Sequence, residues 1–289
     1  MSASESSPSP PLVSVAGSTA GAAAPGGGMT AIVIPARYGS VRFPGKPLAR
    51  QTGKYLIQHV VEQAGKAKRA QRVVVATDDH RIFEAVRSFG GQAVMTSDSH
   101  HSGTDRIAEV MRRPEYLGVR IVVNVQGDEP DIEPGVIDGL IGALEEADVE
   151  MATAAAPFAA ERDVLNPNLV KVVVDQRHYA LYFSRSVVPF DRDRSGLTLG
   201  GDLRAYRRHL GIYAYRREAL LRLAGTPVCE LERIEKLEQL RALYLGMKIF
   251  VQMVAAAPHG VDTPEDYAAF VKRYNEARRH EEHEGTRRN

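Results

Sequence analysis

The residues best suited to chemistry lie in a basic loop, 35–47, that directly follows the first apolar run of the chain. Arg37, Arg42 and Lys46 place three cations within ten residues, with no acid between them. Guanidinium forks and an ammonium group suit the oxygens of a triphosphate, which carries about four negative charges. We therefore predict that this loop binds a nucleoside triphosphate. A solvated basic surface loop is the alternative, because the spacing matches neither a Walker A motif nor a dinucleotide fingerprint.

Two acids, far apart in the sequence, are candidates for a metal site. Asp128 follows the apolar run 121–125 almost at once, and Mg²⁺ is usually held by one or two carboxylates plus phosphate oxygens and waters. A capping aspartate before the next helix is the alternative reading of this residue. Asp262 precedes Thr263, which is the expected helix cap, so Asp262 is not needed for capping. It is a candidate to share one Mg²⁺ with Asp128, although sequence spacing does not show that the two meet.

Two further polar loops are candidates for contacts with a base and a ribose. Thr77 and Asp78 end the second apolar run, and Ser102 stands just before a helical pattern. Hydroxyl, carboxylate and backbone groups of this kind bind base edges and ribose hydroxyls. For Ser102 a role as a helix N-cap alone is an equal alternative.

A regular alternation of strands and helices positions these loops. Nearly continuous apolar strands separated by helices are typical of a parallel sheet covered on both faces. Ligands bind such open sheets at the carboxyl ends of the strands, where the basic loop and Asp128 both begin. Strands are predicted at 31–35, 72–77, 92–95, 121–125 and 151–156, and helices at 55–67, 81–88, 104–111 and 135–146.

The second half of the chain is less regular. We predict one continuous domain, 29–280, with an inserted β-rich lobe at about 170–215 and a charged loop or arm at 191–208. On the helix 231–245, Glu232, Glu235 and Gln239 share a face suited to sugar hydroxyls, although most such acidic stripes are merely solvated. The remaining strands are predicted at 170–174, 181–183, 209–215 and 249–254, and the remaining helices at 217–223 and 264–279.

Composition limits the partners that the protein can have. The chain has 289 residues, 44% of them hydrophobic, and a formal net charge of +1, which gives no global reason to expect nucleic-acid binding. No apolar run approaches the roughly 20 residues of a membrane helix. The single cysteine, Cys229, excludes an internal disulfide framework and fits a reducing cytoplasm. Residues 1–28, rich in Ser, Ala, Pro and Gly, are predicted to be a disordered tail, and 281–289 a flexible one.

Taken in order, these motifs make the chain resemble the 3-deoxy-manno-octulosonate cytidylyltransferase family. The resemblance covers essentially 29–279. It implies a GT-A-like Rossmannoid α/β fold, usually a homodimer whose second-half lobe forms the subunit contact. It also implies the Mg²⁺-dependent reaction of CTP with 3-deoxy-D-manno-octulosonate (Kdo) to give CMP-Kdo and diphosphate, in the cytoplasm, for lipopolysaccharide synthesis. The matching segments are 34–48, 76–78, 101–104, 124–130, 166–173, 179–185, 209–213, 237–241 and 260–266.

The resemblance also implies roles for individual residues. Lys46, Arg37 and Asp128 are the catalytic candidates, and Asp128 and Asp262 are the implied Mg²⁺ ligands. Arg185 is suited to the carboxylate of Kdo. The implied nucleotide ligands are Arg37, Arg42, Lys46, Thr77, Asp78, Ser102 and Gln126, and the implied Kdo ligands are Arg185, His209, Tyr213, Glu235 and Gln239.

Some alternatives remain open at this point. Phe43 and Gly39 depart from the family pattern, where leucine and alanine are commoner, without changing the charge of the loop. A CMP-sialate synthetase shares the chemistry but normally lacks this opening loop. A Rossmann-type oxidoreductase needs a glycine fingerprint where Arg37 and Arg42 stand. A non-catalytic sugar-nucleotide-binding protein would not need both Asp128 and Asp262.

Overall fold

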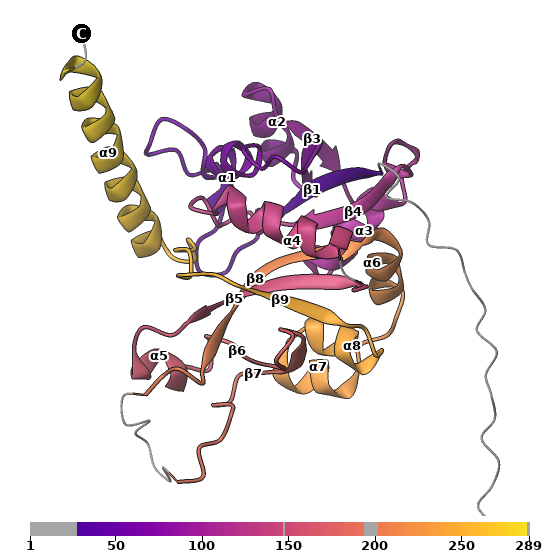
Figure 1. Ribbon diagram of the computed structural model, residues 1–289. Helices are drawn as coiled ribbons and strands as arrows, with labels where there is room; N and C mark the ends of the chain where they lie inside the picture. The colour runs from indigo at the N-terminus through magenta and orange to yellow at the C-terminus, as the bar shows by residue number, and fades with distance from the viewer. Residues whose placement is uncertain (1–27, 147, 194–201, 288–289) are drawn as a thin grey trace, which may run out of the picture.

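A mixed sheet of nine strands forms the centre of the described part of the chain (Figure 1). The computed structural model describes residues 28–146, 148–193 and 202–287, with side chains through 279. Almost all of the predicted tail 1–28 therefore lies outside the described residues. The strands are β1 (Met29–Ala36), β2 (Arg72–Thr77), β3 (Gln92–Met95), β4 (Val119–Asn124), β5 (Met151–Pro157), β6 (Lys171–Val174), β7 (Ala180–Ser184), β8 (Arg207–Arg216) and β9 (Ile249–Met253).

The strand order is β3-β2-β1-β4-β8-β5-β9, with the β6–β7 hairpin beside β8. Strands β1 to β4 pair in parallel, as do β5 and β9, whereas β8 runs antiparallel between β4 and β5. This confirms the predicted α/β class with a mostly parallel sheet. β8 lies within the range predicted for the inserted lobe, yet it belongs to the central sheet; the domain division itself stays a prediction.

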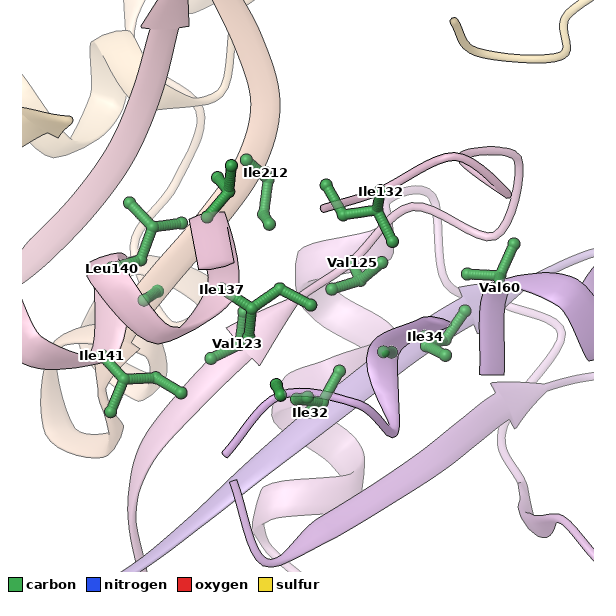
Figure 2. Packing of buried hydrophobic residues seen from close by; sticks show 14 of the residues in the cluster. Ile32, Ile34, Val60, Val123, Val125, Ile132, Ile137, Leu140, Ile141 and Ile212 are labelled. Atoms are coloured by element: carbon green, nitrogen blue, oxygen red, sulfur yellow. The ribbon is translucent and has the colours of Figure 1, made fainter. Parts of the chain in front are cut away.

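Helices cover both faces of the sheet because successive strand residues point to opposite sides. Ile32 and Ile34 pack with α1 and α4, as Figure 2 shows, whereas Ala31 and Val33 pack with α3 and α6 on the other face. The helices and 3-10 turns are η1 (Lys46–Leu48), α1 (Leu56–Ala64), α2 (His80–Ser88), α3 (Gly103–Met111), η2 (Pro114–Tyr116), α4 (Pro134–Glu146), α5 (Glu161–Leu165), α6 (Arg217–Ala224), α7 (Glu230–Glu235), α8 (Gln239–Tyr244) and α9 (Pro264–Arg287).

The structure corrects several predicted boundaries in the second half. The helix predicted at 231–245 is wrong: α7 and α8 are separate helices, because Lys236 adopts a left-handed conformation (φ 54°) that ends the first one. The turn lets Leu237 enter the core. Arg207 and Arg208, expected in the loop 191–208, begin strand β8, and 194–201 lie outside the described residues.

The last helix, α9, projects from the body of the molecule (Figure 1). Its first turns pack Tyr267 and Phe270 against Leu56 at the start of α1. The helix continues through 287, so most of the segment predicted as a tail at 281–289 is helical. None of the described helices is both long and apolar enough to span a membrane.

Candidate functional site

The basic loop folds around the ring of Tyr38. Gly45 has a left-handed conformation (φ 70°), and a Cβ at this position would lie 2.9 Å from the Tyr38 ring, so a larger residue is excluded for two reasons. The Arg81 guanidinium also packs over the ring, with its carbon 3.5 Å from the ring centroid. Arg81 is held in turn by a two-point ion pair with Asp79, the N-cap of α2. The loop conformation is therefore supported from within and from α2.

Lys46 brings the two predicted metal ligands together. Its Nζ donates hydrogen bonds to Asp128 Oδ2 (2.7 Å) and to the Val261 carbonyl oxygen (2.8 Å), and it lies 3.6 Å from Asp262 Oδ1. Arg42 Nη2 lies 3.2 Å from the same Asp262 oxygen. The carboxylates of Asp128 and Asp262 thus face one cationic position, although they are distant in sequence.

This pair of carboxylates fits a divalent cation that is completed by a ligand. In the described residues no group of three or more His, Cys, Asp or Glu side chains gathers to form a full metal site. Mg²⁺ commonly uses only one or two carboxylates and takes its other ligands from phosphate and water. Asp128 and Asp262 line a cavity together with Arg37, Arg42 and Lys46, so the three cations of the basic loop and the two acids share one space.

A second cavity continues the first one toward α3. Both are lined by Arg37 and Gln126, and the second adds Ser102 and the guanidinium-bearing Arg106. Ser102 caps α3 by accepting a hydrogen bond from the Asp105 backbone N–H (3.1 Å), so the capping role is present beside the cavity. The two cavities together form an extended groove along the carboxyl ends of β1 and β4.

Thr77 and Asp78 are absent from the described residues that line this groove. Thr77 is fully buried, and its hydroxyl accepts a hydrogen bond from the Asp79 backbone N–H. Asp78 accepts a hydrogen bond from Arg106 Nη2 at 2.6 Å. The same guanidinium also donates to Thr96 Oγ1 at 2.5 Å. Arg106, which the sequence analysis did not single out, therefore connects Asp78 to the groove.

A third cavity, of about 410 Å³, lies between β8 and α8. Three of the residues predicted to bind the sugar, His209, Tyr213 and Gln239, line it together. Arg185 and Glu235 are absent from its described lining and instead bind each other. The Arg185 backbone N–H donates to Glu235 Oε2 (2.8 Å), its Nε donates to the Glu235 carbonyl oxygen (2.6 Å), and its Nη1 donates to the Pro167 carbonyl oxygen (3.0 Å).

The stripe predicted on the helix 231–245 divides among different environments. Glu232 is buried and forms an ion pair with Arg241, whose Nε lies 2.9 Å from Glu232 Oε2. Glu235 accepts hydrogen bonds from the Ser184 hydroxyl and from Arg185. Of the three residues, only Gln239 lines the third cavity. The break at Lys236 destroys the spacing on which the stripe rested.

His209 is a neutral side chain with a defined tautomer. Burial lowers its pKa from 6.5 to about 3. The Thr153 hydroxyl has one hydrogen and lies 2.8 Å from the Ile212 carbonyl oxygen, to which it donates. Its oxygen therefore accepts from His209 Nε2, 3.0 Å away, so this ring nitrogen carries the proton. The remaining nitrogen, Nδ1, is an acceptor. Burial likewise raises the pKa of Tyr213 well above 10, so its phenol stays protonated.

A fourth, smaller cavity adds two charged residues that the sequence analysis missed. Glu129 and Arg208 line it together with Asp128 and Asp262. Burial, and then the Asp128 charge, raises the pKa of Glu129 to about 7. Glu129 directly follows Asp128, so proximity to the predicted metal ligand was the available signal. Arg208 was not considered as a site residue because the strand was predicted to begin one residue later, at 209, which placed Arg208 in the loop.

The chain is similar over most of its length to known cytidylyltransferases. The family profile described as Cytidylyltransferase matches residues 31–249. The 3-deoxy-manno-octulosonate cytidylyltransferase of Thermodesulfovibrio yellowstonii is 48% identical over 252 residues, covering 86% of this chain and 98% of the relative. That of Geobacter sulfurreducens is 50% identical over 240 residues, covering 81% and 94%. The structure of a CMP:2-keto-3-deoxy-manno-octonic acid synthetase complexed with CTP has a TM-score of 0.78 and 42% identity, covering 86% of this chain and 99% of that one.

Proposed function

The chain belongs to the 3-deoxy-manno-octulosonate cytidylyltransferase family, and on that premise we propose that it transfers CMP from CTP to Kdo and releases diphosphate. The observation that carries this proposal is the convergence of Arg37, Arg42 and Lys46 with Asp128 and Asp262 on one cavity. The product, CMP-Kdo, is the activated sugar acid used in lipopolysaccharide synthesis. CTP is a cytoplasmic metabolite, so we place the reaction in the cytoplasm.

The groove and the third cavity divide the two substrates between them. Arg37, Arg42 and Lys46 bind the triphosphate, and Ser102 and Gln126 face the nucleoside in the continuation of the groove. Thr77 and Asp78 act indirectly: Asp78 positions Arg106 by a hydrogen bond, and Thr77 holds the backbone N–H of Asp79. The sugar acid occupies the third cavity, where His209, Tyr213 and Gln239 supply polar groups. Gln126 lines both spaces, at the junction where the substrates meet.

The reaction is an in-line displacement at the α-phosphorus. The oxygen of the 2-hydroxyl of Kdo forms a bond to phosphorus, the bond to the bridging oxygen of the diphosphate breaks, and the hydroxyl proton is released. Lys46, Arg37 and Arg42 neutralise negative charge on the phosphates and hold them in line. His209 is neutral and donates through Nε2 to Thr153, so its free Nδ1 accepts a hydrogen bond from a sugar hydroxyl.

Asp128 and Asp262 are the proposed ligands of Mg²⁺. When bound, the ion polarises phosphate oxygens and makes a neighbouring hydroxyl more acidic. In the described arrangement the Lys46 ammonium lies between the two carboxylates, so this side chain balances their charge until nucleotide arrives. Lys46 is then released to contact phosphate, which couples nucleotide binding to the two acids.

We also propose that the protein is a homodimer. Five large apolar side chains on β7, α7, α8 and the adjoining loop are exposed: Leu181, Val228, Leu231, Ile234 and Tyr244. The elements that carry them contact one another, and apolar patches on a surface mark contact sites. Sedimentation equilibrium tests this directly. Wild type should sediment as a dimer and I234E as a weaker dimer or monomer, and a monomeric wild type at micromolar concentration contradicts the proposal.

Diphosphate release is the experiment that tests the function. Wild type with CTP, Mg²⁺ and Kdo should release diphosphate, and each omission, including removal of Mg²⁺ with EDTA, should stop the reaction. Sialate in place of Kdo, and ATP, GTP or UTP in place of CTP, should give little product. Activity only with sialate, or equal activity with every sugar acid, contradicts the assignment of Kdo. Activity that survives EDTA contradicts the role of Asp128 and Asp262 as metal ligands.

A further inference from the structure

We propose that Arg208 is the residue that binds the carboxylate of the sugar acid and so selects for a 2-keto acid. This inference rests on the proposed function and names the residue that recognises the acid group at its site. Arg208 is half-buried near the start of β8 and lines both the third cavity and the small cavity that holds Asp128, Asp262 and Glu129.

The chemistry of the substrate determines where its carboxylate must lie. In a 2-keto-3-deoxy octonic acid the carboxyl carbon is bonded directly to C2, the carbon that bears the attacking hydroxyl. When that hydroxyl approaches the phosphorus beside Asp128 and Asp262, the carboxylate is therefore within a few ångströms of the two acids. Arg208 lies at the junction between the two cavities, where the carboxylate has to be.

Arg208 shares the small cavity with three acids, Asp128, Glu129 and Asp262. No salt bridge joins Arg208 to any of these acids among the described residues, so a gap remains between its guanidinium and their carboxyl groups. A carboxylate that enters this gap meets a guanidinium, which is the side chain best matched to it in geometry.

The N–H groups of the Arg208 side chain are also available to a ligand. In the described ranges 28–146, 148–193 and 202–287 no hydrogen bond or ion pair of its side chain is recorded, whereas the arginines beside it are engaged. Arg207 donates to the carbonyl oxygens of Arg204 and Tyr206, and Arg204 pairs with Asp202. A buried or half-buried cation without a partner in the free protein is suited to an anionic ligand.

The two other candidate cations fit less well. Arg185 spends its Nε and Nη1 on the carbonyl oxygens of Glu235 and Pro167, and it is absent from the described lining of every cavity considered above. Lys236 lines the third cavity but not the cavity of the two acids. Arg185 therefore holds backbone segments of the sugar lobe together, whereas Arg208 binds the carboxylate of the sugar acid.

The test compares a charged and a neutral substrate in several variants. Initial rates of diphosphate release at saturating CTP give kcat/KM for Kdo and for its C1 amide, which lacks the negative charge. Wild type should prefer Kdo by about 10- to 100-fold, the range of a charge-assisted hydrogen bond. R208Q should reduce this preference to less than about 3-fold, and R208K, which keeps the charge but not the fork, should retain part of it.

Two matched variants separate this role from a structural one. R207Q changes the neighbouring arginine on the same strand, and R185Q removes the alternative cation; both should keep the preference for Kdo over the amide, whatever they do to absolute rates. The KM for CTP in R208Q should stay within about 2-fold of wild type, which also shows that the variant is folded. Should R208Q prove unstable, R208K with the same pair of substrates decides the question.

The outcomes are distinct. Unchanged preference in R208Q, or lost preference in R185Q, overturns the assignment of Arg208 while the proposed function stands. No diphosphate release by wild type with CTP and Kdo overturns the proposed function first, and the role of Arg208 with it.

Discussion

The nucleotide end and the sugar end of the site are built in different ways. At the nucleotide end, Arg37 directly follows β1, Lys46 ends the loop that β1 leads into, and Asp128 lies in the loop after β4, so all three come from loops that leave strands of the parallel sheet. At the sugar end, His209 lies within the antiparallel strand β8 and Gln239 begins the short helix α8, and their neighbours come from several other segments. The first end follows from local sequence, whereas the second depends on long-range pairing.

The partners of the cationic side chains also differ between the two ends. Lys46 and Arg42 contact carboxylates that are the proposed metal ligands, so on the proposed function both cations would exchange these partners for phosphate. Arg185, in contrast, donates hydrogen bonds to the carbonyl oxygens of Glu235 and Pro167, which are part of the backbone. A cation at the first end is thus poised for exchange, and one at the second end is part of the scaffold. Charge alone does not distinguish these two roles.

Replacing Asp128, at the nucleotide end, should have the largest effect. D128N should lower kcat by about 100- to 1,000-fold, because it removes charge where the transition state is stabilised. The fold should persist, since the Asp128 side chain is 32% exposed. Diphosphate release and thermal unfolding measure the two quantities. E145Q is the control: Glu145 lies on α4 and forms an exposed salt bridge with Arg69, so this variant should be fully active. Near-normal kcat in D128N would exclude Asp128 as a metal ligand.

The pH dependence of stability sharpens the picture of the sugar end. Burial lowers the pKa of His209 from 6.5 to about 3. Between these values the unfolded chain binds the additional proton, so the free energy of unfolding falls as the pH falls, by up to about 1.4 kcal/mol per pH unit. H209N lacks this group and should show a shallower loss of stability below pH 6.5.

Urea unfolding of both proteins at several pH values between 7 and 4 measures the difference, in which any constant cost of the substitution cancels. The curves should diverge as the pH is lowered, with wild type losing stability faster. Parallel curves would mean that the pKa of His209 in the folded protein is close to its ordinary value, which would contradict the lowering ascribed to burial.

The smallest effect is expected at the support of the nucleotide loop. R81A removes the guanidinium that packs on the Tyr38 ring at 3.5 Å. A cation–π contact at an exposed site is worth about 0.5–1 kcal/mol, so the KM for CTP should rise by about 2- to 5-fold. The KM for Kdo should not change, because Arg81 is absent from the described lining of the sugar cavity.

R87A, a substitution in the last turn of the same helix, is the matched control for R81A. It should leave both KM values unchanged. An increase in the KM for Kdo in R81A as large as that for CTP would show that the two ends are not independent.

Most of the parallel half of the fold could be predicted because its signals are local. The strands at 72–77 and 92–95 have the predicted bounds, and the basic loop follows the first strand as expected. The helix predicted at 231–245 was wrong for a reason that lies in the tertiary structure: Leu237 packs into the core, and Lys236 turns to allow it. Periodicity alone carries no signal for such a break.

The sequence by itself determined the charge of the nucleotide end: three cations in a stiff loop after a strand, and an acid after another. Its order of motifs also indicated the family. Only the tertiary structure decided that Asp128 and Asp262 meet around Lys46, because segments distant in the chain close that contact. Only the tertiary structure separated Arg185 from Arg208. The two have the same side chain, but Arg185 donates from Nε and Nη1 to backbone carbonyl oxygens, while Arg208 lines both the third and the fourth cavity.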